Sequence, residues 1–77
     1  MTDIRERCQN MMAKCPAAIG LLIDSTGRHP LEWKISSWNS DKFYYVKLPK
    51  EIVGCLPAEI QEELCRQLIE ARVRLGT

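Results

Sequence analysis

The fold is decided by the stretch LPAEIQEELCRQLIEARVRLG, residues 56–76, which is the longest uninterrupted helical pattern in the chain. Pro57 suits a first helical turn, where its missing N–H has no partner to lose, and Gly76 stands where a helix commonly ends in a left-handed residue. Glutamates gather in the first half, while Arg72 and Arg74 lie in the last turn, which matches the helix dipole. The sequence therefore predicts one long C-terminal helix.

Two apolar strips run along this helix. At about 100° per residue, the first falls within one narrow arc, as expected of a face that packs on a core. It consists of Ile60, Leu64, Leu68, Ala71 and Leu75. The second apolar strip lies further round the helix and consists of Cys65, Ile69 and Val73. We expect the second strip to pack either on the other helix of the same chain or on another molecule, which is a partner or a second copy that forms a homodimer through this strip.

Length and composition set broad limits on the class of protein. A chain of 77 residues makes one domain, residues 1–77, with a core so small that oligomerisation would help it. Its 45% hydrophobic and 27% charged content is that of an ordinary soluble globular protein. The formal net charge of +1 argues against a nucleic-acid binder that depends on electrostatic attraction alone.

The longest apolar run, residues 17–23, bears on location. It is far too short to span a bilayer, and it does not follow a basic leader. We therefore expect no membrane segment and no signal peptide. A cytoplasmic protein with reduced cysteines is the interpretation that follows.

The N-terminal part has the spacing of an amphipathic helix over residues 2–15. Thr2 can cap this helix, Asp3 suits its first turn, and Pro16 ends it. Its apolar face consists of Ile4, Cys8, Met11, Met12 and Cys15.

Three strands are expected between the helices. The run of residues 17–23 fits a buried strand or a short helix, and we favour a strand over residues 20–24. Residues 31–36 alternate apolar and polar, and residues 43–48 return as an aromatic and β-branched strand, which predicts a hairpin. Residues 50–54 can make one helical turn. The predicted fold is α+β: an N-terminal helix, a three-stranded antiparallel meander and a C-terminal helix, with both helices on one face of the sheet.

The cysteines and the histidine give no recognisable catalytic or metal motif. Cys8, Cys15, Cys55 and Cys65 lack any Cys-x-x-Cys knuckle, so we expect small buried hydrophobic side chains and no metal. Disulfides, a reactive thiol and a non-standard metal site remain alternatives. His29 is expected to be an exposed loop residue.

The glutamates of the C-terminal helix are expected to be a solvated face. On this interpretation Glu62 pairs with Arg66 and Glu70 pairs with Arg74. We therefore predict no catalytic residues and no cofactor.

The aromatic residues form the most suggestive group. All of them lie between residues 33 and 45, interleaved with lysines, so they fit a core, a protein interface or a surface that stacks nucleic-acid bases. Trp33 and one of Tyr44 or Tyr45 are expected in the core, whereas Trp38, in the hairpin loop, is the residue that packing explains least. Our predicted partner-binding residues are Trp38, Lys42, Tyr44 and Lys34.

These observations favour a small non-enzymatic protein-binding module that regulates or inhibits a larger protein. Small size and the lack of catalytic motifs also suit an accessory protein of a phage or another mobile element. The alternative is a nucleic-acid-binding module that uses the aromatic and lysine residues of the hairpin, residues 31–48.

Overall fold

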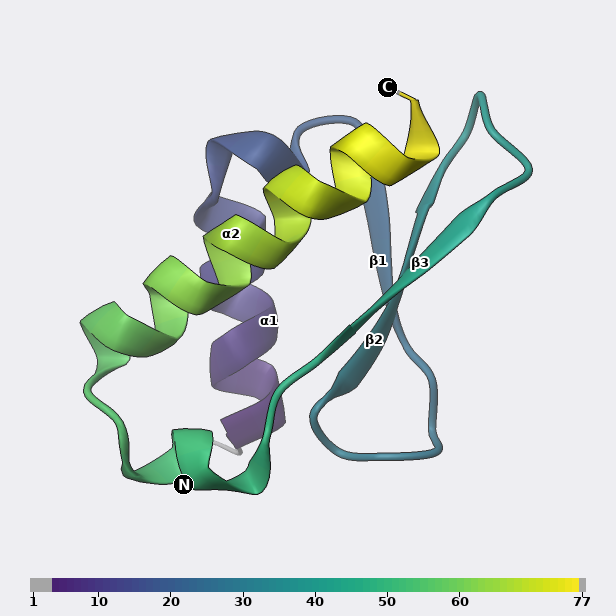
Figure 1. The fold of residues 1–77 in the computed structure, drawn as a ribbon. Coiled ribbons are helices and arrows are strands. Elements are labelled where there is room, and N and C mark those ends of the chain that lie inside the picture. Colours follow the sequence, from purple (N-terminus) through teal and green to yellow (C-terminus); the bar gives the residue numbers. More distant parts are fainter. Residues whose placement is uncertain (1–3, 77) are drawn as a thin grey trace.

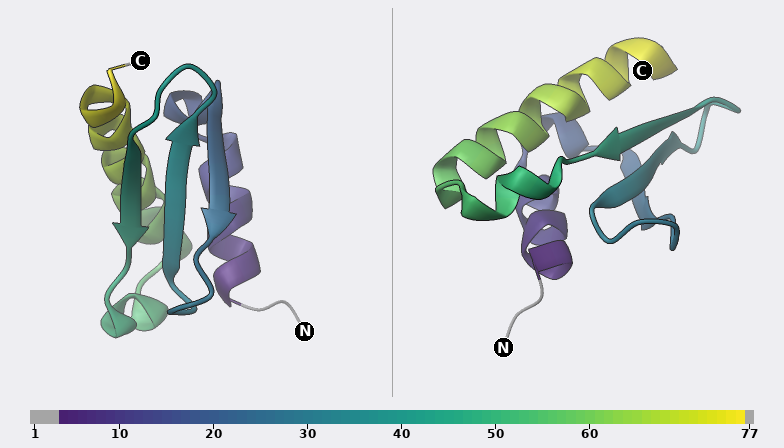
Figure 2. Two further views of the ribbon diagram at one scale, coloured as in Figure 1. Left: turned by 90° about the vertical axis from the view of Figure 1, so that its right-hand side faces the viewer. Right: turned by 60° about the horizontal axis from the view of Figure 1, so that its bottom comes forward.

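The computed structural model describes residues 4–76 and shows a three-stranded antiparallel sheet with two helices on one of its faces (Figure 1, Figure 2). The predicted α+β fold is confirmed. Thr2, expected to cap the first helix, and Asp3, expected in its first turn, lie outside the described residues. The elements in chain order are α1 (Ile4–Lys14), the 3-10 turn η1 (Pro16–Ala18), β1 (Leu21–Ser25), β2 (Glu32–Ser37), β3 (Phe43–Lys47), the 3-10 turn η2 (Lys50–Gly54) and α2 (Pro57–Leu75).

α2 begins and ends where the sequence predicts. Leu56 is extended, Pro57 opens the first turn, and Gly76 has a φ of 75°, a left-handed conformation that an L side chain rarely adopts. The Gly76 N–H donates to the carbonyl groups of Arg72 and Val73, which satisfies the last turn. All five residues of the first apolar strip are buried, so this face of α2 packs on the core.

The core lies between the sheet and the two helices. β2 contributes Trp33 and Ile35 and β3 contributes Val46, all with no exposed surface. They pack with the first strip of α2 and with Met12 of α1. Burying such side chains stabilises the fold by about 1.5–3 kcal/mol each.

Small shifts in the strands have local causes. Gly20 has a φ of 82°, so β1 starts only at the next residue. The Leu31 carbonyl accepts a hydrogen bond from the Leu48 N–H, which continues the pairing of β2 with β3 just beyond the ends of both strands. Within residues 4–76, no helix combines the length and apolar composition needed to cross a bilayer.

Candidate binding surface

The sheet has one face that the helices leave open, which we call the outer sheet face. Successive side chains of a strand point to opposite faces, so the burial of Trp33 and Ile35 sends Lys34 outward. The strand register then places two rows of three side chains on the outer face, followed by the pair of Glu32 and Lys47. One row is Leu22, Ser36 and Phe43, and the other is Asp24, Lys34 and Tyr45.

Large apolar groups are exposed on the outer sheet face and in the loop that joins β2 to β3. Phe43 is 55% exposed, Leu22 is 54% exposed, and Tyr45 is also open to solvent. Trp38 lies in the loop that joins β2 to β3 and is 82% exposed. The hairpin that carries it projects from the end of the sheet (Figure 1). The core uses none of these four side chains, so they form a candidate contact surface.

Cations cover the aromatic rings of the outer face. Lys34 Nζ lies 4.3 Å from the centre of the Phe43 ring, and Arg28 Cζ lies 5.1 Å from the centre of the Tyr45 ring. Such cation–π contacts are worth about 0.5–1 kcal/mol each at exposed sites. One side of each ring is therefore occupied by a charged group.

A shallow cavity of about 250 Å³ lies beside the Tyr45 ring, on the β1 side of the sheet. Its lining combines hydroxyl groups with charges of both signs, so the lining alone does not favour an anion or a cation. The lining residues are Asp24, Ser25, Thr26, Arg28, Lys34 and Tyr45.

Glu32 organises one wall of this cavity, although it is not among the lining residues. Its carboxylate accepts a hydrogen bond from Thr26 Oγ1 at 2.8 Å and one from Arg28 Nε at 3.2 Å. The hydrogen bond from Thr26, together with the positive charge of Arg28, holds the pKa of Glu32 below its ordinary value. The pair of Arg28 and Glu32 was missed by sequence reasoning, and its only local signal is the spacing of four residues.

The structure separates the predicted partner-binding residues. Trp38, Lys34 and Lys42 are on the open side of the sheet or in the hairpin loop, where the Lys42 N–H bonds to Ser40 Oγ at 3.2 Å. Of the two tyrosines, one of which was expected in the core, Tyr44 is the inward one, so its predicted role in partner binding is not supported by its position. Tyr44 pairs with the inward-facing Ile35 and packs, half-buried, against the core. Tyr45, one residue on, takes the outward position.

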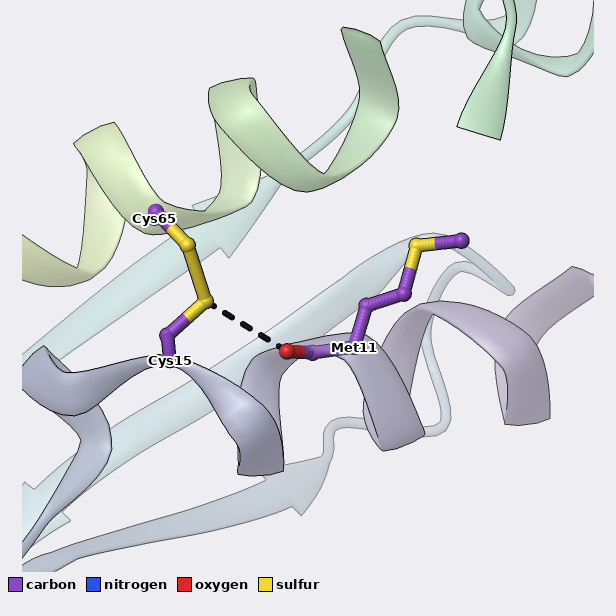
Figure 3. The surroundings of a disulfide bond; sticks show 3 residues. All are labelled: Met11, Cys15 and Cys65. Carbon is purple, nitrogen blue, oxygen red and sulfur yellow. Dashed lines mark hydrogen bonds between the residues drawn. A yellow bond between two sulfur atoms is a disulfide. The ribbon is translucent and has the colours of Figure 1, made fainter. Parts of the chain in front are cut away.

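One of the three residues of the second apolar strip of α2 forms a covalent bond within the molecule. Cys65 forms a disulfide with Cys15, which connects the middle of α2 to the end of α1, so its sulfur is used inside the molecule (Figure 3). Ile69 and Val73 remain exposed. Between the two strips, Arg72 Nη1 donates hydrogen bonds to the carbonyl oxygens of Ala17, at 3.1 Å, and Ile19. The role of the strip in a dimer stays a prediction.

The disulfide corrects the expectation that Cys15 and Cys65 are small buried thiols. The two residues are 50 positions apart, yet their Cα atoms are 5.8 Å apart, within the range that a disulfide needs. Cys15 Sγ also lies 3.3 Å from the Met11 carbonyl oxygen, the contact dashed in Figure 3. Sulfur in a disulfide carries no hydrogen, so Cys15 can donate this hydrogen bond only after reduction.

The remaining candidate groups are two free cysteines and one histidine. Cys8 is a buried free thiol whose pKa is raised by burial, and Cys55 is free and half-buried. Residues 4–76 contain no group of three or more potential metal ligands. His29 is half-buried rather than exposed, because its Nδ1 accepts a hydrogen bond from the Leu31 N–H at 3.1 Å and helps to close the turn before β2.

The charged face of α2 forms local ion pairs. Glu70 pairs with Arg74 at 2.9 Å, as predicted. Arg66 pairs at 2.6 Å with Glu63, three residues earlier, in place of the predicted Glu62. Both arginines are largely exposed, so these pairs contribute little to stability.

Comparison of the chain with family models, with curated proteins and with solved structures gave no match. The outer sheet face is therefore interpreted from its own residues.

Proposed function

We propose that the protein is a small non-enzymatic binding module that regulates or inhibits a larger protein, and that it acts as a homodimer. The partner contacts the outer sheet face and the hairpin loop, through Trp38, Phe43 and Tyr45 with Lys34 and Lys42 beside them. The observation that supports this most is the exposure of Trp38, a side chain that buries 150–250 Å² at interfaces and is enriched among the residues that dominate binding.

The charges of this surface favour a protein over a nucleic acid as the partner. Lys34 and Arg28 already occupy one side of the Phe43 and Tyr45 rings. A base that stacked on that side would first have to displace them, whereas a protein side chain can pack on the ring edges. Aromatic and arginine side chains together are also the usual composition of an interface centre.

The test compares capture of the partner from a lysate of the native source by the wild type and by two variants. Trp38→Ala should weaken the affinity for the captured protein by about thirtyfold, the effect of a residue that dominates an interface. Leu56→Ser is the matched control, because Leu56 is also exposed but lies at the start of α2. Equal capture by the wild type and Trp38→Ala would remove the basis of the proposal.

The alternative is a nucleic-acid-binding module. It is supported by the two aromatic rings with cations on the outer face, and by Lys42 in the adjoining loop. A single-stranded oligonucleotide titrated at two salt concentrations distinguishes the alternatives. Binding that weakens steeply with salt and is reduced in Lys34→Gln and Lys42→Gln supports nucleic acid. Absence of binding at low salt leaves the protein partner.

The disulfide bears on the location of the protein. The cytoplasmic location inferred from the sequence remains a prediction, and the disulfide between Cys15 and Cys65 counts against it, since such bonds persist mainly in oxidising compartments.

A further inference from the structure

The edge of the sheet formed by β1 is apolar on both faces. Leu21 and Ile23 point towards the helices but are only half-buried, whereas Trp33 and Ile35 beside them on β2 are fully buried. The difference arises because β1 has a neighbouring strand on one side only. On the outer face, Leu22 is exposed as well. Three consecutive apolar side chains are therefore partly open to solvent along this edge.

The backbone of β1 also has groups that point away from the sheet. The Thr26 N–H donates to the Glu32 carbonyl just beyond the two strands, in the same register. Because hydrogen-bonded pairs alternate along an antiparallel ladder, Leu22 and Asp24 bond to β2. The N–H and C=O groups of Leu21, Ile23 and Ser25 then point outward, where another strand can pair with them.

The opposite edge, formed by β3, is protected in ways that β1 is not. The outward carbonyl of Lys47 accepts a hydrogen bond from Gln67 Nε2 of α2 at 3.3 Å. Lys47 itself and the nearby Pro49 are residues that natural proteins use to block edge pairing. The sequence of β1, LLIDS, contains no lysine, arginine or proline. An open, apolar edge of this kind is a pairing site.

We propose that a second copy of the chain pairs with this edge, β1 against β1 in antiparallel orientation with Leu22 on the two-fold axis, to form one six-stranded sheet. This inference rests on the homodimer of the proposed function and places its interface on β1. Leu22 then meets Leu22 of the second copy on the outer face, and Leu21 meets Ile23 on the inner face.

Charge does not oppose this self-pairing, and the backbone hydrogen bonding is compatible with it. The one charged residue of β1, Asp24, lies opposite Gly20 of the second copy, so no like charges face each other. In the same register the outward backbone groups of Leu21 face those of Ile23, as a hydrogen-bonded pair requires. The two-fold axis uses the same patch on both copies, which gives a closed dimer.

The interface is short. A strand of five residues is about 17 Å long, so the contact is smaller than a typical stable interface and the dimer forms at high protein concentration. In sedimentation equilibrium the average mass should rise from 8.9 kDa towards about twice that value as the concentration rises about a hundredfold.

Amide hydrogen exchange gives a readout at single residues. The amides of Leu21 and Ile23 should become protected as the concentration rises, because they point outward in the monomer. The amides of Leu22 and Asp24 are bonded to β2 in either state, so their protection should change less. Protection of Leu21 and Ile23 that is independent of concentration would overturn the proposal.

Two lysine substitutions in the same row of the outer face provide a matched pair. Leu22→Lys should weaken the dimer by about tenfold or more, because it places two ammonium groups side by side on the axis. Phe43→Lys changes a residue of almost equal exposure, 55% against 54%, on the opposite edge, and should leave the dimer unchanged. The dissociation constants come from the same sedimentation series.

The outcomes separate this inference from the proposed function. A dimer that survives Leu22→Lys but is lost in Ile69→Asp overturns the β1 interface in favour of the second apolar strip. Amide protection at β1 that requires an added partner overturns it in favour of a strand from that partner. Capture that depends on Trp38 tests the binding function, because Trp38 lies in the loop between β2 and β3 and takes no part in the proposed β1 interface.

Discussion

Removal of the disulfide should cost the protein a large part of its stability. The bond between Cys15 and Cys65 closes a loop of 50 residues, and the loss of loop-closure entropy in the unfolded chain corresponds to about 4 kcal/mol at 25 °C. A chain of 77 residues is expected to have a total unfolding free energy of about 4–12 kcal/mol. Cys65→Ser should therefore remove at least a third of it.

Thermal unfolding followed by circular dichroism measures this effect. At 4–8 °C for each kcal/mol, the midpoint of Cys65→Ser should lie about 15–30 °C below that of the oxidised wild type. Cys65 is half-buried, so serine fits without a large void, and the freed Cys15 thiol can donate to the Met11 carbonyl oxygen. The change should therefore report mainly the lost cross-link.

Reductant and a second cysteine variant provide the controls. Dithiothreitol should lower the wild-type midpoint to that of Cys65→Ser and leave the variant itself unaffected. Cys55→Ser alters a free, half-buried thiol and should behave as the wild type does. The oxidised, denatured wild type should show two free thiols out of four cysteines. A wild-type midpoint that does not respond to reductant would show that the two helices are held together by packing alone.

Three further outcomes follow from burial and hydrogen bonding. Leu68→Ala should lower the unfolding free energy by about 2–5 kcal/mol in urea denaturation, because Leu68 has no exposed surface. In Thr26→Ala, an NMR titration should show the pKa of Glu32 moving up towards its ordinary 4.5, since the Thr26 hydrogen bond is the main cause of its lowering. A carboxyl group whose pKa is lower in the folded state stabilises the fold above pH 4.5, and this contribution is lost as the pH falls through the folded-state pKa. Thr26→Ala has less of this contribution to lose, so acid should lower its unfolding free energy less than that of the wild type. Iodoacetamide should alkylate Cys55 well before Cys8, whose thiol is buried and has a raised pKa, and mass mapping of the modified peptides would detect the reverse order.

The sequence predicts best what local patterns determine. The limits of α2 follow from Pro57 and Gly76, and its buried face follows from helical periodicity. β2 follows from strict alternation, which identifies Trp33 and Ile35 as core residues. In each case the signal lies within a few residues of the feature that it predicts.

The orientation of the tyrosines could not be read in this way. Tyr44 and Tyr45 are adjacent and identical, and they lie in a strand of large side chains. Alternation within β3 therefore does not show which of the two faces inward. The register with β2 decides it, because Tyr44 pairs with the buried Ile35 and Tyr45 pairs with Lys34. That information belongs to the pairing of strands and not to either strand alone.

Long-range features were the hardest to predict. Neither the disulfide nor the cavity beside Tyr45 has a local motif. Cys15 and Cys65 come together only because the end of α1 packs beside the middle of α2. The cavity forms where Arg28, in the turn between β1 and β2, lies over the Tyr45 ring of β3. The spacing of cysteines in the sequence excludes a zinc knuckle but says nothing about such a pair.

The strand register also explains why the outer face is informative about function. Once Trp33 and Ile35 are buried, the side chains that pair with Lys34 and Ser36 must point away from the core. Stability of a one-sided sheet requires only that these positions tolerate water and favour a strand, which threonine would do as well as an aromatic residue. Phe43 and Tyr45 stand there instead, each with a cation over its ring. Folding alone does not require aromatic side chains at these positions, and this difference is the reason why we propose the outer sheet face as the surface that contacts a partner.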